Sequence, residues 1–338
     1  MRAGLSTAPP PQNHPPRGVG IAPHKRLHGG GNYVVLSAML KIEPVGRGDL
    51  HRALRLLAGG EGGGRLARLE AMLSGSDAQR CKLWWARTLR GPRAAAMTAL
   101  NPGRCAMVFH SAPPRGKSGV RILSHLIAEL TGATLAGGAA FAQVMIPPGD
   151  ARPAEAFQQA GYSRLAELIY LRRGMRRELP MGDSGLTWEP FSRGHERRLE
   201  EVIADTYTGS RDCSGLLGLR EMSDVVAAHK ASGIFRPESW WIPTSGREPV
   251  GCVLVNGAPG GGNACDLVYL GTRPKWRRKG FGRMMLRHAL AHAAGGGMKR
   301  MHLAVDSSNA VAVRLYRQEG FRERARQDVY IKPAGGGA

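Results

Sequence analysis

The sequence predicts an α/β protein in which one mixed-sheet fold occurs twice in tandem. The chain has 338 residues, more than one ordinary domain of ~150 residues, and three short features recur in the same order at nearly constant spacing. These pairs are Trp84-Trp85 with Trp240-Trp241, Cys105 with Cys265, and Gly161-Tyr162 with Gly320-Phe321. In the second copy, a run of adjacent strands precedes strand–helix–strand units, a pattern typical of a mixed sheet.

The chain divides into a tail and two halves. Residues 1–38 are rich in Pro, Gly and His and contain no acidic residue, which predicts a disordered tail. They could instead be an upstream extension of a chain that starts at Met39. Residues 39–178 are predicted to be the first copy and residues 184–333 the second. The charged, Gly- and Pro-bearing stretch near residues 172–185 is the expected join.

Each element of the second copy is predicted from its own pattern. Residues 194–207 place Leu199 and Ile203 at helical spacing, and Ser223 is the expected N-cap of a helix over 223–233. Apolar and β-branched runs between Gly-rich turns predict strands. The expected strands cover residues 186–191, 240–245, 249–257, 264–271, 301–306 and 327–333, and further helices cover 283–294 and 309–320.

Composition limits the partners and the compartment. Lys plus Arg number 48 against 26 acidic residues, a net charge of +22. This balance favours nucleic acid, an acidic membrane surface or a phosphorylated cofactor, although an Arg-rich genome would give the same bias. Five scattered cysteines without a CxxC pair argue against a disulfide framework or a zinc cluster and fit a reducing cytoplasm. No apolar run approaches the ~20 residues of a membrane span.

The stretch Arg277–Leu286 (RRKGFGRMML) suggests a phosphate site. Gly280 and Gly282 flank Phe281 where a strand is expected to pass into a helix, so backbone N–H groups can approach an anion at the helix N-terminus. The neighbouring cations are Arg277, Arg278, Lys279 and Arg283. A tight turn is the alternative. The run is not a dinucleotide-binding loop, because it lacks the third Gly, and it is not a Walker loop, because it lacks GK[ST].

Two motifs together carry a family resemblance. The first, Arg277-x-x-Gly280-x-Gly282, resembles the pyrophosphate-binding motif R/Q-x-x-G-x-G/A of the GNAT acetyltransferase superfamily. The second is NAVAVRLYRQEGF, which supplies Asn309, Ala312, Leu315, Tyr316, Gly320 and Phe321. The resemblance covers residues 186–333 directly and residues 39–175 only through the internal repeat.

The resemblance implies acetyl-CoA as the donor. Backbone amides of Arg278, Lys279, Gly280, Phe281 and Gly282 would hold its pyrophosphate, at the start of a helix that begins near Arg283. The strand end at Leu270, Gly271 and Thr272 would pair with the pantetheine arm, where family members splay two strands apart. Asn309 and Tyr316 complete the expected cofactor-binding set, and no metal is expected.

The implied chemistry is direct attack of a neutral primary amine on the thioester. Such a reaction needs a proton acceptor for the amine, a donor to the thioester oxygen and an acid for the leaving thiolate. Tyr316 is the implied acid, with a buried core tyrosine as the alternative, and the Leu270 amide is the candidate oxygen donor. Asp266 or Tyr269 would be the base, although Asp266 could equally be a surface charge at a strand edge.

Two other patterns are given structural interpretations. His288 and His292 have metal-ligand spacing on one helix but lack a third ligand, which favours a solvated helix face. The Trp240-Trp241 pair could stack on a nucleic-acid base, but alternation along a strand predicts that at least one of the two is in the core.

The first copy is predicted to be degenerate. Aligning Gly161 with Gly320 puts Phe157 in the place of Tyr316 and Asp150 in that of Asn309. Aligning Gly119 with Gly282 puts Lys117 at Gly280 and removes the Gly-x-Gly spacing. An alternative is that Arg115, Gly116 and Lys117 still hold a coenzyme non-productively.

The sequence therefore predicts a cytoplasmic N-acetyltransferase whose second half is active on an unidentified amine, in a small molecule, a peptide N-terminus or a lysine. Residues 207–236 occupy the family's acceptor side but indicate no amine class. The rival hypothesis is a non-enzymatic coenzyme A sensor or a basic nucleic-acid adaptor that uses the same tandem fold.

Overall fold

The computed structural model describes residues 40–59, 63–75, 78–175, 185–210 and 212–335. The predicted tail and most of the predicted join lie outside these residues. Residues 172–174 are described and belong to a strand, so the first copy extends as regular structure further into the expected join than the charge pattern indicated.

The two halves present their elements in the same order. The first contains β1 (Lys41–Pro44), α2 (Leu50–Ala58), α3 (Gly63–Ser74), β2 (Cys81–Thr88), β3 (Gly91–Leu100), β4 (Cys105–His110), α4 (Gly119–Ala136), β5 (Phe141–Ile146), α5 (Ala151–Gln159) and β6 (Ser163–Gly174). The second contains β7 (Thr187–Pro190), α6 (Glu196–Tyr207), α7 (Met222–Ala231), β8 (Trp240–Ser245), β9 (Glu248–Pro249), β10 (Gly251–Gly257), β11 (Ala264–Thr272), α8 (Phe281–Gly295), β12 (Arg300–Asp306), α9 (Ala310–Gln318) and β13 (Arg322–Pro333). The repeated sequence features fall on equivalent elements: β2 and β8, β4 and β11, and the turns after α5 and α9.

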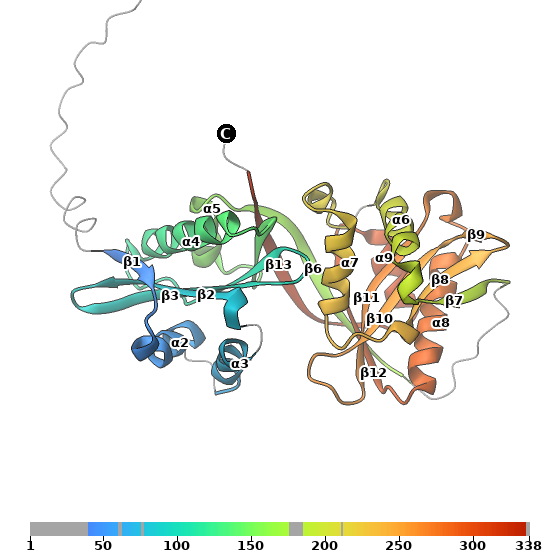
Figure 1. Cartoon of the computed structure of the whole chain (residues 1–338), viewed down its shortest axis with the longest axis horizontal. Coiled ribbons are helices and arrows are strands. Elements are labelled where there is room, and N and C mark those ends of the chain that lie inside the picture. Colours follow the sequence, from blue (N-terminus) through green and yellow to red (C-terminus); the bar gives the residue numbers. More distant parts are fainter. Residues whose placement is uncertain (1–39, 60–62, 76–77, 176–184, 211, 336–338) are drawn as a thin grey trace, which may run out of the picture. The chain divides into compact units, whose positions relative to one another are not determined.

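The halves exchange their final strands within one sheet. The strand order is β1-β2-β3-β4-β5-β13-β6-β12-β11-β10-β8-β7, with β9 beside β8. The last strand of the second half, β13, therefore pairs with β5 of the first, and β6 of the first pairs with β12 of the second. The long strands β6 and β13 also pair with each other (Figure 1). Neither half has a complete sheet without the other's final strand.

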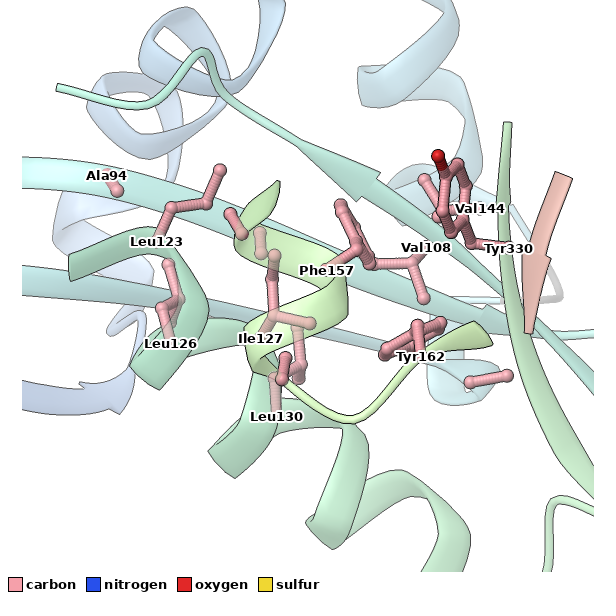
Figure 2. Packing of buried hydrophobic residues seen from close by; sticks show 14 of the residues in the cluster. Ala94, Val108, Leu123, Leu126, Ile127, Leu130, Val144, Phe157, Tyr162 and Tyr330 are labelled. Atoms are coloured by element: carbon pink, nitrogen blue, oxygen red, sulfur yellow. The ribbon is translucent and has the colours of Figure 1, made fainter. Parts of the chain in front are cut away.

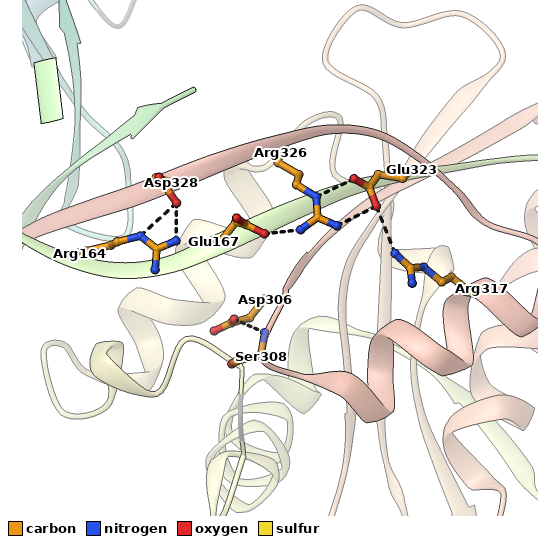
Figure 3. Close-up of polar contacts among 8 residues, drawn as sticks. All are labelled: Arg164, Glu167, Asp306, Ser308, Arg317, Glu323, Arg326 and Asp328. Atoms are coloured by element: carbon orange, nitrogen blue, oxygen red, sulfur yellow. Dashed lines mark hydrogen bonds and ion pairs between the residues drawn. The ribbon is translucent and has the colours of Figure 1, made fainter. Parts of the chain in front are cut away.

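Charged pairs line the contact between the exchanged strands. Arg164 on β6 pairs with Asp328 on β13 at 2.5 Å, and Arg326 on β13 bridges Glu167 and Glu323 (Figure 3). Exposed pairs of this kind stabilise by ~0–1 kcal/mol each. Because opposite charges face each other only in one register, their main contribution is to the alignment of the two strands.

Helices cover both faces of the sheet. In the first half, α4 and α5 pack Leu126, Ile127 and Phe157 against the strands (Figure 2). Tyr330 of β13 belongs to this same cluster, so the exchanged strand supplies core to the opposite half. In the second half, α8 and α9 cover one face and α6 and α7 the other.

Local features of the second half refine the predictions. Trp240 and Trp241 are both buried, on opposite faces of the sheet, which confirms the core interpretation. The predicted cap at Ser223 is wrong: α7 starts at Met222, with Glu221 as its N-cap. Helix α8 starts at Phe281, two residues before the predicted start, because Gly280 adopts φ +86° and caps it.

Candidate functional site

Strands β11 and β12 separate in the middle of the sheet and leave a gap. They pair only at Ala264–Arg300, Cys265–Met301 and Asp266–His302. Beyond this point β11 continues along β10 and β12 continues along β6.

Strand β11 turns free amides toward this gap. The N–H of Arg273 donates to the carbonyl of Val250 beside β10. Peptide groups alternate sides along a strand, so the N–H groups of Thr272 and Leu270 point away from β10, into the gap. A bulge opposite Leu254 and Val255 interrupts the register of β11 just before this segment. The Leu270 amide, the predicted oxygen donor, thus faces the gap.

The loop before α8 forms a row of unused donors. Arg278 (φ +60°) and Gly280 (φ +86°) both adopt left-handed backbone conformations, and consecutive N–H groups in such a turn converge on one point. Within the described chain, nothing accepts a hydrogen bond from the N–H groups of residues 278–282. The exposed cations Arg278 and Lys279 stand beside them, and Lys279 lies 5.1 Å from the Trp276 ring centroid. Such an arrangement suits an anion at a helix N-terminus.

Two predicted phosphate ligands have other partners. The guanidinium of Arg277 donates to the carbonyls of Thr272 (3.1 Å) and Thr206 (2.9 Å), tying the end of β11 to the end of α6. Arg283 pairs with Glu319 at 3.2 Å and contacts Gln318, which joins α8 to α9. Both arginines therefore shape the site, and their charges are largely engaged within the protein.

Four further residues of the predicted cofactor-binding set have structural contacts of their own. Asn309 caps α9 by accepting a hydrogen bond from the Ala312 N–H at 3.2 Å. The ring of Phe281 packs edge-on against Trp276. A Cβ on Gly282 would make ordinary contacts with Thr272 and Leu270, and one on Gly271 would come within 2.7 Å of the Thr206 hydroxyl. Gly271 is therefore required for packing against α6.

Tyr316 carries an unused hydroxyl. The residue is only 7% exposed and its ring packs edge-on against Phe321 on the α8/α9 face. Its hydroxyl has no hydrogen-bond partner within the described part of the chain. Burial raises the pKa of Tyr316 well above its ordinary value, so the group keeps its proton at neutral pH, as a general acid must.

The two candidate bases, Asp266 and Tyr269, differ in their hydrogen-bond partners and in their ability to accept a proton. The Asp266 carboxylate lies 3.3 Å from His302 Nδ1, and burial raises its pKa while the His302 charge partly opposes this. The Tyr269 hydroxyl lies 2.6 Å from the Thr206 hydroxyl, and burial raises the pKa of Tyr269 well above its usual value. Tyr269 therefore holds its proton at neutral pH, which makes it a poor proton acceptor.

A family model matches part of the second half. Residues 204–321, which contain the gap, the donor row and Tyr316, match the model of the Acetyltransferase (GNAT) family. Over this segment the chain is similar to the GNAT family. The GNAT match includes both motifs and ends at Phe321, before β13.

Relatives and solved structures extend the comparison. Over 83 residues the chain is 34% identical to a mycothiol acetyltransferase of Nocardiopsis dassonvillei, covering 25% of this chain and 24% of that protein. Over 70 residues it is 34% identical to a [ribosomal protein bS18]-alanine N-acetyltransferase of Salmonella typhimurium, covering 21% and 47%. The chain thus spans less than half the length of each curated relative.

Solved structures of other proteins are similar to most of this chain. A GCN5-related N-acetyltransferase from Sphaerobacter thermophilus matches 88% of this chain and 97% of its own, at TM-score 0.59 and 18% identity. A tandem GNAT protein from the clavulanic acid biosynthesis pathway matches 88% and 100%, at TM-score 0.51 and 13% identity. These likenesses concern the fold, which is a tandem GNAT fold.

The first copy differs from the second at the start of its equivalent helix and at the position of Tyr316. A Cβ on Gly119 would stand 1.7 Å from the Pro114 carbonyl oxygen, so that oxygen crowds the start of α4 where an anion would bind. Ser118 caps α4 as Gly280 caps α8, one residue away from the register that pairs Lys117 with Gly280. Phe157 is fully buried and packs edge-on against His110.

The histidine pair of α8 is not a solvated face. His288 stacks on Trp188 with ring centroids 3.6 Å apart and meets Trp241 edge-on, and His292 also packs against Trp241. Burial lowers the pKa of His288 to about 4. Among the described residues, no group of three His, Cys, Asp or Glu side chains is placed to hold a metal ion.

Two surface hollows lie beside α6, outside the gap between β11 and β12. One is lined by Arg197, Asp205 and Arg273, and the other by Phe191 and Lys230. Their charges are already paired, Arg273 with Asp205 and Lys230 with Glu196. The gap, with its unpaired donors, is the better candidate site. No described helix is long and apolar enough to cross a membrane.

Proposed function

We propose that the second half transfers an acetyl group from acetyl-CoA to a primary amine by direct attack. One observation carries the proposal: the row of unused N–H groups at residues 278–282 adjoins the gap that contains the free edge of β11. A pyrophosphate suits the first feature and an extended amide-bearing arm suits the second.

Each part of acetyl-CoA then has a partner in the protein. The pyrophosphate accepts hydrogen bonds from the loop amides, beside the charges of Arg278 and Lys279. The pantetheine arm adds to the edge of β11 at Leu270 and Thr272, as an extra strand would. The Leu270 N–H donates to the thioester oxygen and stabilises the charge that develops there.

Proton transfer completes the reaction. Tyr316 protonates the departing thiolate, because burial keeps its hydroxyl protonated and nothing in the described chain occupies it. Of the two bases expected from the family position, Asp266 is the stronger candidate, because Tyr269 keeps its proton at neutral pH.

The first half has a supporting role in this proposal. Its β3–β4 turn packs tightly on α7: a Cβ on Gly103 would lie 2.3 Å from the Asp224 carbonyl. Arg220 donates to the Gly103 carbonyl at 2.9 Å and lies over the Phe141 ring. The degenerate copy thereby buttresses the acceptor side of the working copy.

A thiol-release assay tests the proposal. Acetyl-CoA is supplied with a panel of amines that includes polyamines, aminoglycosides, amino acids and peptides. Because one relative is named for an alanine of a ribosomal protein, peptides beginning with alanine belong in the panel. Amine-dependent thiol release that Gly280→Glu abolishes supports the function. Absence of coenzyme A binding, together with a salt-sensitive nucleic-acid gel shift, would favour the adaptor instead.

A further inference from the structure

The loop after α6 reaches into the gap. The N–H of Ser307 donates to the Glu167 carbonyl on β6 at 2.8 Å. Since successive peptide groups face opposite edges of a strand, the preceding N–H, that of Asp306, faces the edge that β11 has left. The Asp212 carboxylate accepts this N–H at 3.2 Å. Asp212 therefore stands between the separated strands.

Asp306 anchors this loop. Its two carboxylate oxygens accept hydrogen bonds from the N–H groups of Cys213 (3.2 Å) and Ser308 (2.9 Å; Figure 3 shows the latter), and its side chain is buried. Cys213 adopts φ +46°, which turns the chain back at this point. Asp306 is fully used by the backbone, whereas Asp212 has one oxygen without a donor among the described residues.

Three tyrosines from different elements lie near enough to Asp212 to be affected by its charge. Burial raises the pKa of Tyr316 on α9, of Tyr207 on α6 and of Tyr269 on β11, and the Asp212 charge adds to each shift. Burial also raises the pKa of Asp212 itself, although the residue is exposed.

Asp266 occupies a less suitable place. It belongs to the last rung that joins β11 to β12, at the closed end of the gap. Its carboxylate already faces His302. Leu270, by contrast, lies four residues further along β11, where the strands have parted, as does Asp306 on β12.

We propose that Asp212 is the catalytic base that takes the proton from the acceptor amine, and that the acceptor enters as a cationic ammonium group beside Asp212. This inference rests on the proposed acetyl transfer. The Asp212 carboxylate, with one oxygen free of donors among the described residues, can accept a hydrogen bond from a protonated amine.

The proton balance is complete with these residues. Asp212 accepts one proton from the ammonium, directly or through one water, and passes it to solvent. The neutral nitrogen attacks the thioester carbon, forming the C–N bond, and the C–S bond then breaks. Tyr316 gives its proton to the sulfur and regains one from the nitrogen of the adduct. One ammonium and one acetyl-CoA yield one amide, one free thiol and one released proton.

Asp212→Asn in the full chain provides the test. The amide oxygen can still accept the Asp306 N–H, so the loop keeps its anchor, but the side chain can no longer accept a proton. We expect kcat/KM for the amine to fall at least ~100-fold, with the Kd for coenzyme A within about twofold of wild type. Asp49→Asn is the matched control, because Asp49 lies in the first half, before α2, and its side chain makes no cap hydrogen bond. Normal turnover in Asp212→Asn, or loss of turnover in Asp266→Asn alone, would overturn the assignment.

A second measurement does not require the acceptor. The 13C resonance of the Asp212 carboxyl, assigned by its loss in Asp212→Asn, should titrate above the usual aspartate range and change its midpoint when coenzyme A is added. An unmoved midpoint with coenzyme A bound would show that Asp212 is outside the reacting site. Failure of coenzyme A to bind at all, measured by calorimetry, would instead refute the proposed function and this inference with it.

Discussion

Replacing Gly280 by Glu should impair coenzyme binding by the N–H groups of residues 278–282 while leaving the fold intact. Gly280 adopts φ +86°, and a Cβ there would meet no protein atom within 4 Å. The substitution therefore costs only the left-handed strain of a non-glycine residue, ~1–2 kcal/mol of folding free energy. No clash within the protein adds to this cost, and the domain should remain folded.

The effect on coenzyme binding should be much larger. A hydrogen bond to a charged group contributes ~1.5–3 kcal/mol, and the new side chain and its charge would disturb at least two of the bonds from residues 278–282. A loss of ~3 kcal/mol weakens binding at least ~100-fold. Titration calorimetry with coenzyme A measures it directly.

Gly262→Glu is the matched control. Gly262 has φ +72°, is exposed and has no atom within 4 Å of a Cβ position, but it lies in the β10–β11 turn, at the opposite end of β11. Both variants should lose similar stability in denaturant unfolding, and only Gly280→Glu should lose coenzyme A. Undiminished binding by a folded Gly280→Glu protein would refute the assignment of this loop.

Three further predictions concern the acid, the first half and pH. Tyr316→Phe removes only the hydroxyl, so kcat should fall at least tenfold with little change in acetyl-CoA affinity; an unchanged kcat with chemistry rate-limiting would remove Tyr316 as the acid. Calorimetry should give one coenzyme A site per chain, and Lys117→Ala should leave turnover intact; two equivalent sites would mean that the first half also binds. Burial lowers the pKa of His229 to about 4, so the unfolded chain takes up its proton first and stability should fall by up to ~3 kcal/mol between pH 6.5 and 4. Denaturant unfolding at both ends of this range should show a smaller fall in His229→Asn, and an equal fall would contradict the reasoning.

Much of the second half could be predicted from local sequence. The pyrophosphate motif is a local signal, because left-handed turns need Gly and a helix N-terminus follows directly in the chain. The equivalence of Phe157 and Tyr316 likewise depended only on counting back from Gly161 and Gly320, and both residues lie in the last turn and a half of equivalent helices. Strand alternation predicted that at least one of Trp240 and Trp241 is in the core, and both are buried.

The partners of side chains could not be predicted in this way. Arg277 and Arg283 resemble free cations in the sequence, but carbonyl groups of α6 and β11 engage the first and Glu319 the second. Ser223 satisfies the pattern of a cap, yet the helix begins one residue earlier. Asp212 lies 94 residues before Asp306, and no local pattern marks it as part of the gap.

The sequence by itself determined that one fold occurs twice and which copy retains the glycines and the tyrosine, because these are properties of short segments. Only the tertiary structure decided that the two copies exchange β6 and β13 and that Asp212 enters the gap between β11 and β12. Strand pairing depends on backbone groups that every residue carries, so the alternation of β13 is compatible with either β5 or β12 as neighbour. The choice between them depends on distant contacts, such as Tyr330 in the core of the first half and Arg164 against Asp328.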